Sequence, residues 1–208
     1  MKLKHISFAI FFLFSCKQKE LKNNTQIGIS ADTTQRKHSL LNADISPMDM
    51  SWCPVNYPLA KMENNITQKL IARVIYSRPH KNRRQIFGDT PKSLCQYGKP
   101  WRLGANEATE ITFFENVLIA DKNIAKGTYI LYCIPKKDKW QVILNNNLYT
   151  WGLHIDSSKD VFKTEIPVIS QAPIIEDFTM LFEENNTGAN LIMAWDNVKT
   201  VLPIVFKK

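Results

Sequence analysis

The stretch that decides the fold class is Tyr129-Ile130-Leu131-Tyr132-Cys133-Ile134, in the middle of a 208-residue chain. Side chains alternate between the two faces of a β-strand, and here both faces are apolar. Such a strand has to be covered on both sides, so we expect it at the centre of a sheet. A short basic loop, 136–139, joins it to a second apolar run, 140–145, in the pattern of a β-hairpin.

The same kind of pattern recurs along most of the chain. Runs rich in β-branched and aromatic residues occur at 70–77, 109–114, 116–120, 128–135, 140–145, 160–170, 177–183, 189–195 and 200–206. Residues that favour turns separate several of them, at 121–123, 126–127, 185–188 and 196–197. No segment keeps a helical period. The sequence therefore predicts an all-β fold, an antiparallel, jelly-roll-like β-sandwich of about nine strands with little helix.

The first 16 residues have the features of a bacterial lipoprotein signal. Two lysines precede an apolar run, 6–14, which is shorter than the ~20 residues that a membrane-spanning helix needs. The run ends in Leu13-Phe14-Ser15-Cys16, which resembles a lipobox. We expect residues 1–15 to be a signal peptide and the acylated Cys16 to anchor the protein in the bilayer. A conventional cleaved signal without lipid is the alternative.

The segment that follows predicts a tether. Residues 17–51 contain no Phe, Trp or Tyr and cannot bury enough apolar surface to offset the entropy of ordering. We expect a flexible tether over residues 16–45 and a single domain over residues 46–208. The expected location is the envelope of a Gram-negative bacterium, on a membrane that faces the periplasm or the cell surface.

Charge and cysteine content restrict the partners. The formal net charge is +8, with basic clusters at 80–84 and 136–139 that both fall in expected loops. No nucleic-acid reader motif is present, so we expect no nucleic-acid partner. Cys133 lies in the central strand, whereas Cys53 and Cys95 lie in irregular segments and form either a disulfide or two free thiols. No Cys/His pattern indicates zinc, and we expect no metal and no cofactor.

Between the expected strands lies the stretch Tyr97-Gly98-Lys99-Pro100-Trp101-Arg102-Leu103-Gly104-Ala105-Asn106-Glu107-Ala108-Thr109. Charged side chains at the entrance of a β core are expected to form an ion pair, to bind a ligand or to act in catalysis. Three interpretations are open. Arg102 and Glu107 form an architectural ion pair; or Arg102, Asn106 and Glu107 hold a polar ligand; or Glu107 is a catalytic carboxylate.

Other candidate residues lie near a second loop, 151–156. Trp151, together with Trp101, is a candidate to stack on a sugar ring, although both tryptophans also fit a buried core. His154 joins these ligand candidates. His154, Asp156 and His80 could also bind a metal, with a solvated loop as the simpler alternative.

A series of short motifs carries a family resemblance. In chain order they are Ser46-Pro47-Met48-Asp49, Tyr76-Ser77-Arg78-Pro79, Arg84-Gln85-Ile86-Phe87-Gly88, the 97–109 stretch, Lys126-Gly127-Thr128-Tyr129, Trp140-Gln141-Val142-Ile143, Trp151-Gly152 and Trp195…Pro203-Ile204. The series resembles the domain of unknown function 2911 (DUF2911), a family of bacterial envelope lipoproteins, over nearly all of residues 46–204. The chain departs from the family pattern at 89–95, where extra residues stand, and at Cys53, where an aromatic residue is expected. The resemblance implies a lipoprotein and a β-sandwich, and it brings no established activity.

Different classes of function follow from these features. The first is a tethered binding or accessory module that recognises a glycan, a peptidoglycan fragment or a partner protein. The second is a hydrolase of envelope carbohydrate, in which Glu107 works with a second carboxylate such as Asp156 or Asp160. In a third interpretation the domain is purely structural.

Overall fold

The computed structural model describes residues 46–207. The predicted signal peptide, Cys16 and the predicted tether, residues 16–45, lie outside this range. Within the range, no helix is long and apolar enough to cross a membrane.

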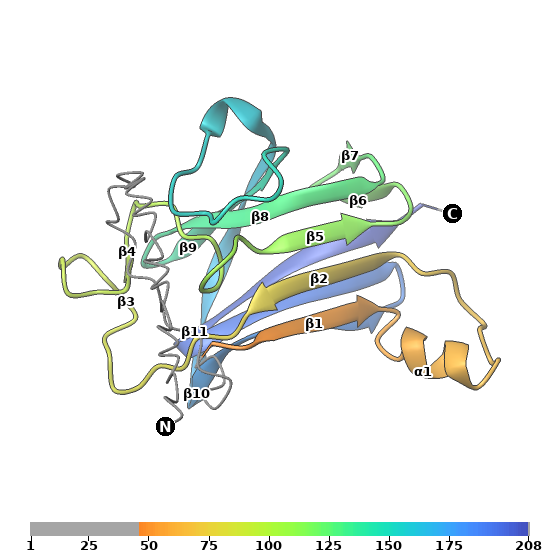
Figure 1. The fold of residues 1–208 in the computed structure, drawn as a ribbon, viewed down its shortest axis with the longest axis horizontal. Coiled ribbons are helices and arrows are strands. Elements are labelled where there is room, and N and C mark those ends of the chain that lie inside the picture. Colours follow the sequence, from red (N-terminus) through yellow and green to blue (C-terminus); the bar gives the residue numbers. More distant parts are fainter. Residues whose placement is uncertain (1–45, 208) are drawn as a thin grey trace, which may run out of the picture. The chain divides into compact units, whose positions relative to one another are not determined.

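One antiparallel sheet of nine strands dominates the structure (Figure 1). In spatial order its strands are β1 (Met48–Cys53), β2 (Ala72–Ser77), β5 (Glu110–Phe113), β8 (Gly127–Pro135), β9 (Lys139–Asn145), β10 (Asp160–Asn185), β11 (Gly188–Phe206), β6 (Val117–Ile119) and β7 (Lys122–Ile124). The remaining elements are the short parallel pair β3 (Phe87–Gly88) and β4 (Cys95–Gln96), the helix α1 (Tyr57–Met62) and the 3₁₀ turn η1 (Ser157–Lys159). The predicted all-β antiparallel fold with little helix is confirmed.

The hairpin predicted from residues 129–145 lies at the centre of the sheet. β8 pairs with β5 on one side and with β9 on the other. The Lys136 amide closes the turn on the Lys139 carbonyl oxygen at 2.9 Å. Residues 130–133 are all buried, so both faces of β8 are covered, as the pattern predicted.

The long strand β10 makes the architecture sandwich-like. Its first part, from Asp160 to Pro167, pairs with β9, and from Val168 onward the strand pairs with β11. Two register shifts, between Ser170 and Thr179, bend it. Its second half lies against β1 and β2, where the Phe182 amide donates to Ser51 Oγ at 3.1 Å. The sheet folds over on itself without closing into a barrel.

Two strand boundaries differ from the prediction. The runs 160–170 and 177–183 belong to one strand, β10, and the runs 189–195 and 200–206 belong to one strand, β11. The turn predicted at 196–197 is instead an irregularity within β11, with Asp196 at φ +57°. The Asp196 carboxylate lies 3.5 Å from Lys81 Nζ. The turn predicted at 185–188 is present, and Asn185 Oδ1 accepts the amides of Thr187 and Gly188.

Aromatic rings fill the space between the two halves of the folded sheet. Trp101, Trp140, Phe178 and Trp195 are buried there and contact one another at ring-centroid distances between 4.9 and 5.9 Å. Three cysteines, Cys53, Cys95 and Cys133, are also buried, and all three thiols are free. The possible Cys53–Cys95 disulfide is therefore not formed in this structure.

Candidate functional site

The motif stretch forms a loop between β4 and β5, and Trp101 anchors it to the core. The backbone amide of Trp101 donates to Cys133 O at 2.7 Å, and the Cys133 amide donates to Trp101 O at 2.9 Å. The indole ring stacks on Trp195 at 5.8 Å, and only 9% of Trp101 is exposed. Burial removes this ring from the candidate ligand surface, because a ligand cannot reach its face.

The middle of the loop needs glycine for steric reasons. A β-carbon on Gly104 would lie 3.0 Å from the Ser77 carbonyl oxygen, closer than side-chain carbons normally approach. Thr109 Oγ1 donates to Leu103 O at 2.6 Å, which closes the loop on itself. Asn106 adopts φ +57° and its Nδ2 donates to Ser46 O at 3.3 Å. Asn106 thus fastens the loop to the start of β1.

Arg102 points to a neighbouring loop. Its Nη1 donates to the Trp151 carbonyl oxygen at 2.8 Å, and its guanidinium carbon lies 5.9 Å from the centroid of the Trp151 ring. Burial lowers the pKa of Arg102, and the negative charge of Glu107 acts in the opposite direction. A guanidinium half-withdrawn from water binds an anionic or hydroxyl oxygen more strongly than a fully solvated one.

Glu107 is exposed to solvent. Although Arg102 and Glu107 influence each other electrostatically, no nitrogen of Arg102 lies within 4.0 Å of the Glu107 carboxylate among the described contacts. The two residues therefore do not form the architectural ion pair that was one interpretation of the sequence. Glu107 presents its carboxylate to solvent beside the arginine.

The second loop, 146–156, presents large apolar side chains to water. The exposed fractions of Tyr149, Trp151 and Leu153 are 90%, 53% and 66%. Large exposed apolar residues that gather in one short loop are a common mark of an interaction surface. Of these three apolar residues, the sequence pointed only to Trp151. No signal in the sequence separated Tyr149 and Leu153 from buried residues, because alternate apolar residues also fit a half-buried strand.

We call the side chains of Arg102, Glu107, Tyr149, Trp151 and Leu153 together the aromatic loop surface. Three contacts hold the second loop against the motif loop. Besides the Arg102 bond, the Ala108 amide donates to Thr150 O at 3.0 Å. Gly152, at φ +75°, packs so closely that a β-carbon there would lie 2.9 Å from the β-carbons of Ala108 and Arg102. The surface is thus held in place rather than carried on an isolated loop.

His154 is exposed on the same loop, but the other two metal candidates have different roles. Asp156 caps η1, accepting the Ser158 amide at 3.0 Å and the Ser158 hydroxyl at 2.6 Å, and these bonds lower its pKa. His80 Nδ1 lies 3.0 Å from Asp177 Oδ1. Within residues 46–207, no three His, Cys, Asp or Glu side chains gather as metal ligands would.

The hydrolase alternative needs a second carboxylate opposite Glu107. Asp156 serves as the η1 cap, and the Asp160 side chain is only 3% exposed. Asp160 accepts hydrogen bonds from the Tyr132 hydroxyl at 2.9 Å and from Asn145 Nδ2 at 2.7 Å, and it pairs with Lys163 Nζ at 2.9 Å. Both candidate partners are thus engaged in structural bonds.

The structure also brings together a polar network that the sequence did not predict. Asp49 Oδ2 lies 3.2 Å from the Tyr76 hydroxyl and 3.4 Å from Arg78 Nη1, and Arg78 Nη2 donates to Thr179 Oγ1 at 3.2 Å. Asp49 belongs to the 46–49 motif of the family resemblance, and Tyr76 and Arg78 belong to the 76–79 motif. Their presence in these motifs is the sequence feature that could have identified them as candidates. Their contacts connect β1 and β2 with β10.

The comparisons with known proteins agree with the family resemblance. A family model described as "Protein of unknown function (DUF2911)" matches residues 57–204. The match includes the motif loop and the second loop, and it begins after β1. No curated protein and no solved structure matches the chain. Because the matched range covers more than half of its length, the chain belongs to the DUF2911 family of proteins of unknown function.

Proposed function

We propose that this protein is a membrane-tethered lipoprotein of the cell envelope that binds a glycan or a peptidoglycan fragment on the aromatic loop surface. The observation that carries the binding proposal is the group of exposed Tyr149, Trp151 and Leu153 beside the half-buried Arg102. Aromatic side chains with a polar neighbour suit ligands that have one apolar face and a polar edge, and a sugar ring is such a ligand.

The geometry suggests a role for each side chain. The rings of Trp151 and Tyr149 would stack on the C–H faces of sugar units. Arg102 would donate to ring substituents or to a carboxylate, because its planar fork provides several directed donors. The Glu107 carboxylate, exposed beside it, would accept hydrogen bonds from sugar hydroxyls. Only binding is proposed, since the second carboxylates considered for hydrolysis are engaged elsewhere.

Titration with soluble peptidoglycan fragments and a panel of oligosaccharides tests the binding, with the Cys16→Ser chain used to avoid detergent. We expect saturable binding, and we expect Trp151→Ala to weaken it at least ~10-fold, about 1.4 kcal/mol. Phe114→Ala is the matched control, because Phe114 is also an exposed aromatic residue but lies outside the surface. Binding that survives unchanged in Trp151→Ala, or that fails equally in Phe114→Ala, contradicts the proposal. If this surface binds a protein and no glycan, then the aromatic loop surface is a protein-binding site and the glycan proposal is wrong.

The membrane anchor is tested separately. The basic start, the apolar run 6–14 and the lipobox-like sequence before Cys16 support acylation of Cys16. We expect the wild-type protein to stay with membranes after a high-salt wash and Cys16→Ser to be released. Retention of Cys16→Ser in the membrane fraction would exclude a lipid anchor at this residue.

A further inference from the structure

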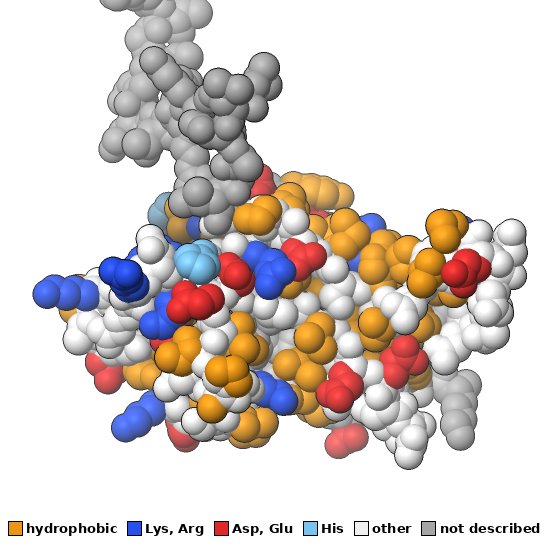
Figure 2. All heavy atoms as spheres, turned by 90° about the horizontal axis from the view of Figure 1, so that it is seen from below, with side chains coloured by type: hydrophobic (Ala, Val, Ile, Leu, Met, Phe, Trp, Pro, Cys, Tyr) orange, Lys and Arg blue, Asp and Glu red, His pale blue; other side chains and the backbone are white. Residues whose placement is uncertain are grey.

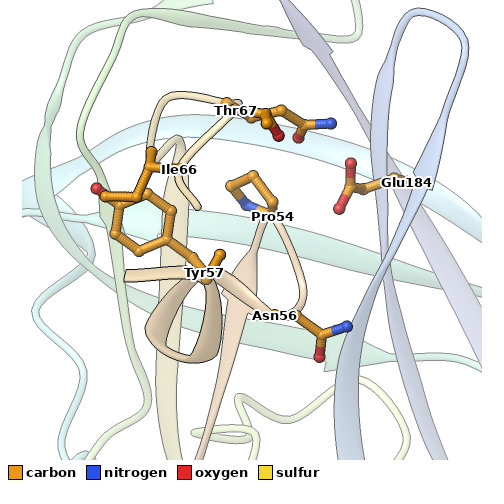
Figure 3. Close-up of a pocket in the computed structure, with 8 residues that line it drawn as sticks. Pro54, Asn56, Tyr57, Ile66, Thr67 and Glu184 are labelled. Atoms are coloured by element: carbon orange, nitrogen blue, oxygen red, sulfur yellow. The ribbon is translucent and has the colours of Figure 1, made fainter. Parts of the chain in front are cut away.

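A cavity of about 140 Å³ opens beside α1, and none of its lining residues belongs to the aromatic loop surface. It is lined by Pro54, Asn56, Tyr57, Ala60, Ile66, Thr67, Gln68 and Glu184. These residues come from three parts of the chain, namely the end of β1 with α1, the segment before β2, and the end of β10. Figure 3 shows the Glu184 carboxylate and the Tyr57 ring on opposite sides of this α1 pocket, with Pro54 between them.

The lining divides into an apolar part and a polar part. Pro54, Tyr57, Ala60 and Ile66 form the apolar part, and Asn56, Thr67, Gln68 and Glu184 supply oxygens. Glu184 is the one charged residue of the lining. Its Oε1 accepts the Val55 amide at 3.1 Å, which orients the carboxylate. Glu184 is exposed, and among residues 46–207 no Lys, Arg or His nitrogen lies within 4.0 Å of its carboxylate, so none of these described residues serves as its counter-ion at that distance.

The size of the pocket limits what it can hold. Sites for whole small molecules enclose roughly 300–1,000 Å³, several times the space available here. One side chain fits better. A lysine side chain has an apolar stem that matches the Pro54 and Tyr57 surfaces and an ammonium group that matches the carboxylate. An arginine side chain carries a larger planar guanidinium in place of the compact ammonium group, and a pocket of about 140 Å³ leaves less room for it.

The rim indicates that a partner protein presents this lysine. Ile66 in the lining is exposed, Val55, Leu59 and Met62 in or next to α1 are also large exposed apolar residues, and no residue of α1 is buried. Hydrophobic side chains also reach the surface in the direction of α1 on the face shown in Figure 2. Charged or polar anchors surrounded by apolar contacts are typical of protein–protein interfaces. We propose that the α1 pocket is a docking site for a lysine side chain of a protein partner, separate from the proposed glycan surface.

The test uses the Cys16→Ser chain, with Nα-acetyl-lysine methylamide as the probe and amide NMR shifts as the readout. We expect saturable shifts at Ala60, Thr67 and Gln68, with none at residues 149–153. The norleucine analogue has the same stem without the ammonium group, and the arginine analogue has a fork in its place. We expect both to bind at least ~10-fold more weakly than the lysine probe.

Two variants separate recognition from general electrostatics. Glu184→Gln removes the charge but keeps an oxygen for the Val55 amide, so we expect an unchanged melting temperature and a ~10-fold loss of lysine affinity. Glu183→Gln removes the same charge from the neighbouring residue, which projects to the other face of β10, and we expect affinity within ~2-fold of wild type. Equal losses in the two variants, equal binding of the norleucine analogue, or the absence of shifts with the lysine probe would overturn the proposal.

Discussion

The hydroxyl of Tyr76 on β2 contacts both backbone polar groups of Met180 on β10. It receives the Met180 amide at 2.9 Å and lies 3.3 Å from the Met180 carbonyl oxygen. β2 and β10 are not paired as strands, and this side chain connects them close to the isolated backbone bridge between His80 and Asp177.

Replacing Tyr76 with Phe should therefore destabilise the protein. The change leaves the buried amide and carbonyl of Met180 without the Tyr76 hydroxyl, which costs about 1–3 kcal/mol. Urea unfolding of the mature chain measures the loss. Tyr129→Phe is the control, because it removes an exposed bond to Ala125 O at 2.8 Å and should cost less than ~1 kcal/mol. Equal losses of unfolding free energy in Tyr76→Phe and Tyr129→Phe would show that the Tyr76–Met180 hydrogen bonds stabilise the fold no more than an exposed hydrogen bond does.

Alkaline pH should weaken the fold. Burial raises the pKa of Tyr76 from its ordinary value of 10.0 to about 12, and that of Cys53 from 9.0 to about 12. Between pH 9 and 12 the unfolded chain releases these protons while the folded chain keeps them, so the free energy of unfolding falls as pH rises. Urea titrations at pH 8, 9.5 and 11 measure the slope. We expect a shallower slope above pH 10 in Tyr76→Phe, and a flat wild-type curve would contradict the assignment.

The cysteines of the domain should resist alkylation until the protein unfolds. Cys53, Cys95 and Cys133 are free and buried, and burial raises the pKa of each thiol. The thiolate is the reactive form, so native protein at pH 8 should incorporate almost no iodoacetamide at these positions. Peptide mass spectrometry after labelling in guanidinium without reductant should find all three modified. Protection of Cys53 and Cys95 under those conditions would instead reveal a disulfide.

Two glycines with the same backbone angle should respond differently to substitution. Gly152 and Gly98 have φ values of +75° and +74°, but only at Gly152 would a β-carbon collide with neighbours. Gly98→Ala should lose about 1 kcal/mol from the positive φ alone. Gly152→Ala should lose about 1–3 kcal/mol more and should also weaken glycan binding, because Trp151 is displaced. Thermal unfolding and the glycan titration measure both effects, and identical stability losses would mean that the loops are not held together at Gly152.

Arg102 and Glu107 should behave as separate residues in stability measurements. Arg102→Leu removes the donor to the Trp151 carbonyl and should cost about 1 kcal/mol, whereas Glu107→Gln on the exposed side should stay within ~0.5 kcal/mol of wild type. A double-mutant cycle should be additive within ~0.5 kcal/mol. If the double variant regains several kcal/mol of the unfolding free energy lost in the single variants, then Arg102 and Glu107 form a buried ion pair after all.

The sequence by itself determined the fold class. Apolar residues on both faces of 129–134 predicted a central strand, and β8 is buried between β5 and β9. This inference worked because the alternation of side chains along a strand is a local property of the sequence. It did not reveal that residues 160–185 form one bent strand, since the partner changes from β9 to β11 within it and partner choice depends on the rest of the sheet.

The motif loop was also located from the sequence, but the role of each residue was not. Burial of Trp101 depends on Trp195, and the orientation of Arg102 depends on a carbonyl 49 residues away. Tyr149 and Leu153 became candidates only when the structure showed that no core covers them. Sequence composition can place a charge or a ring near the end of a strand. Whether that side chain faces protein or water is decided by contacts between distant segments, which only the tertiary structure supplies.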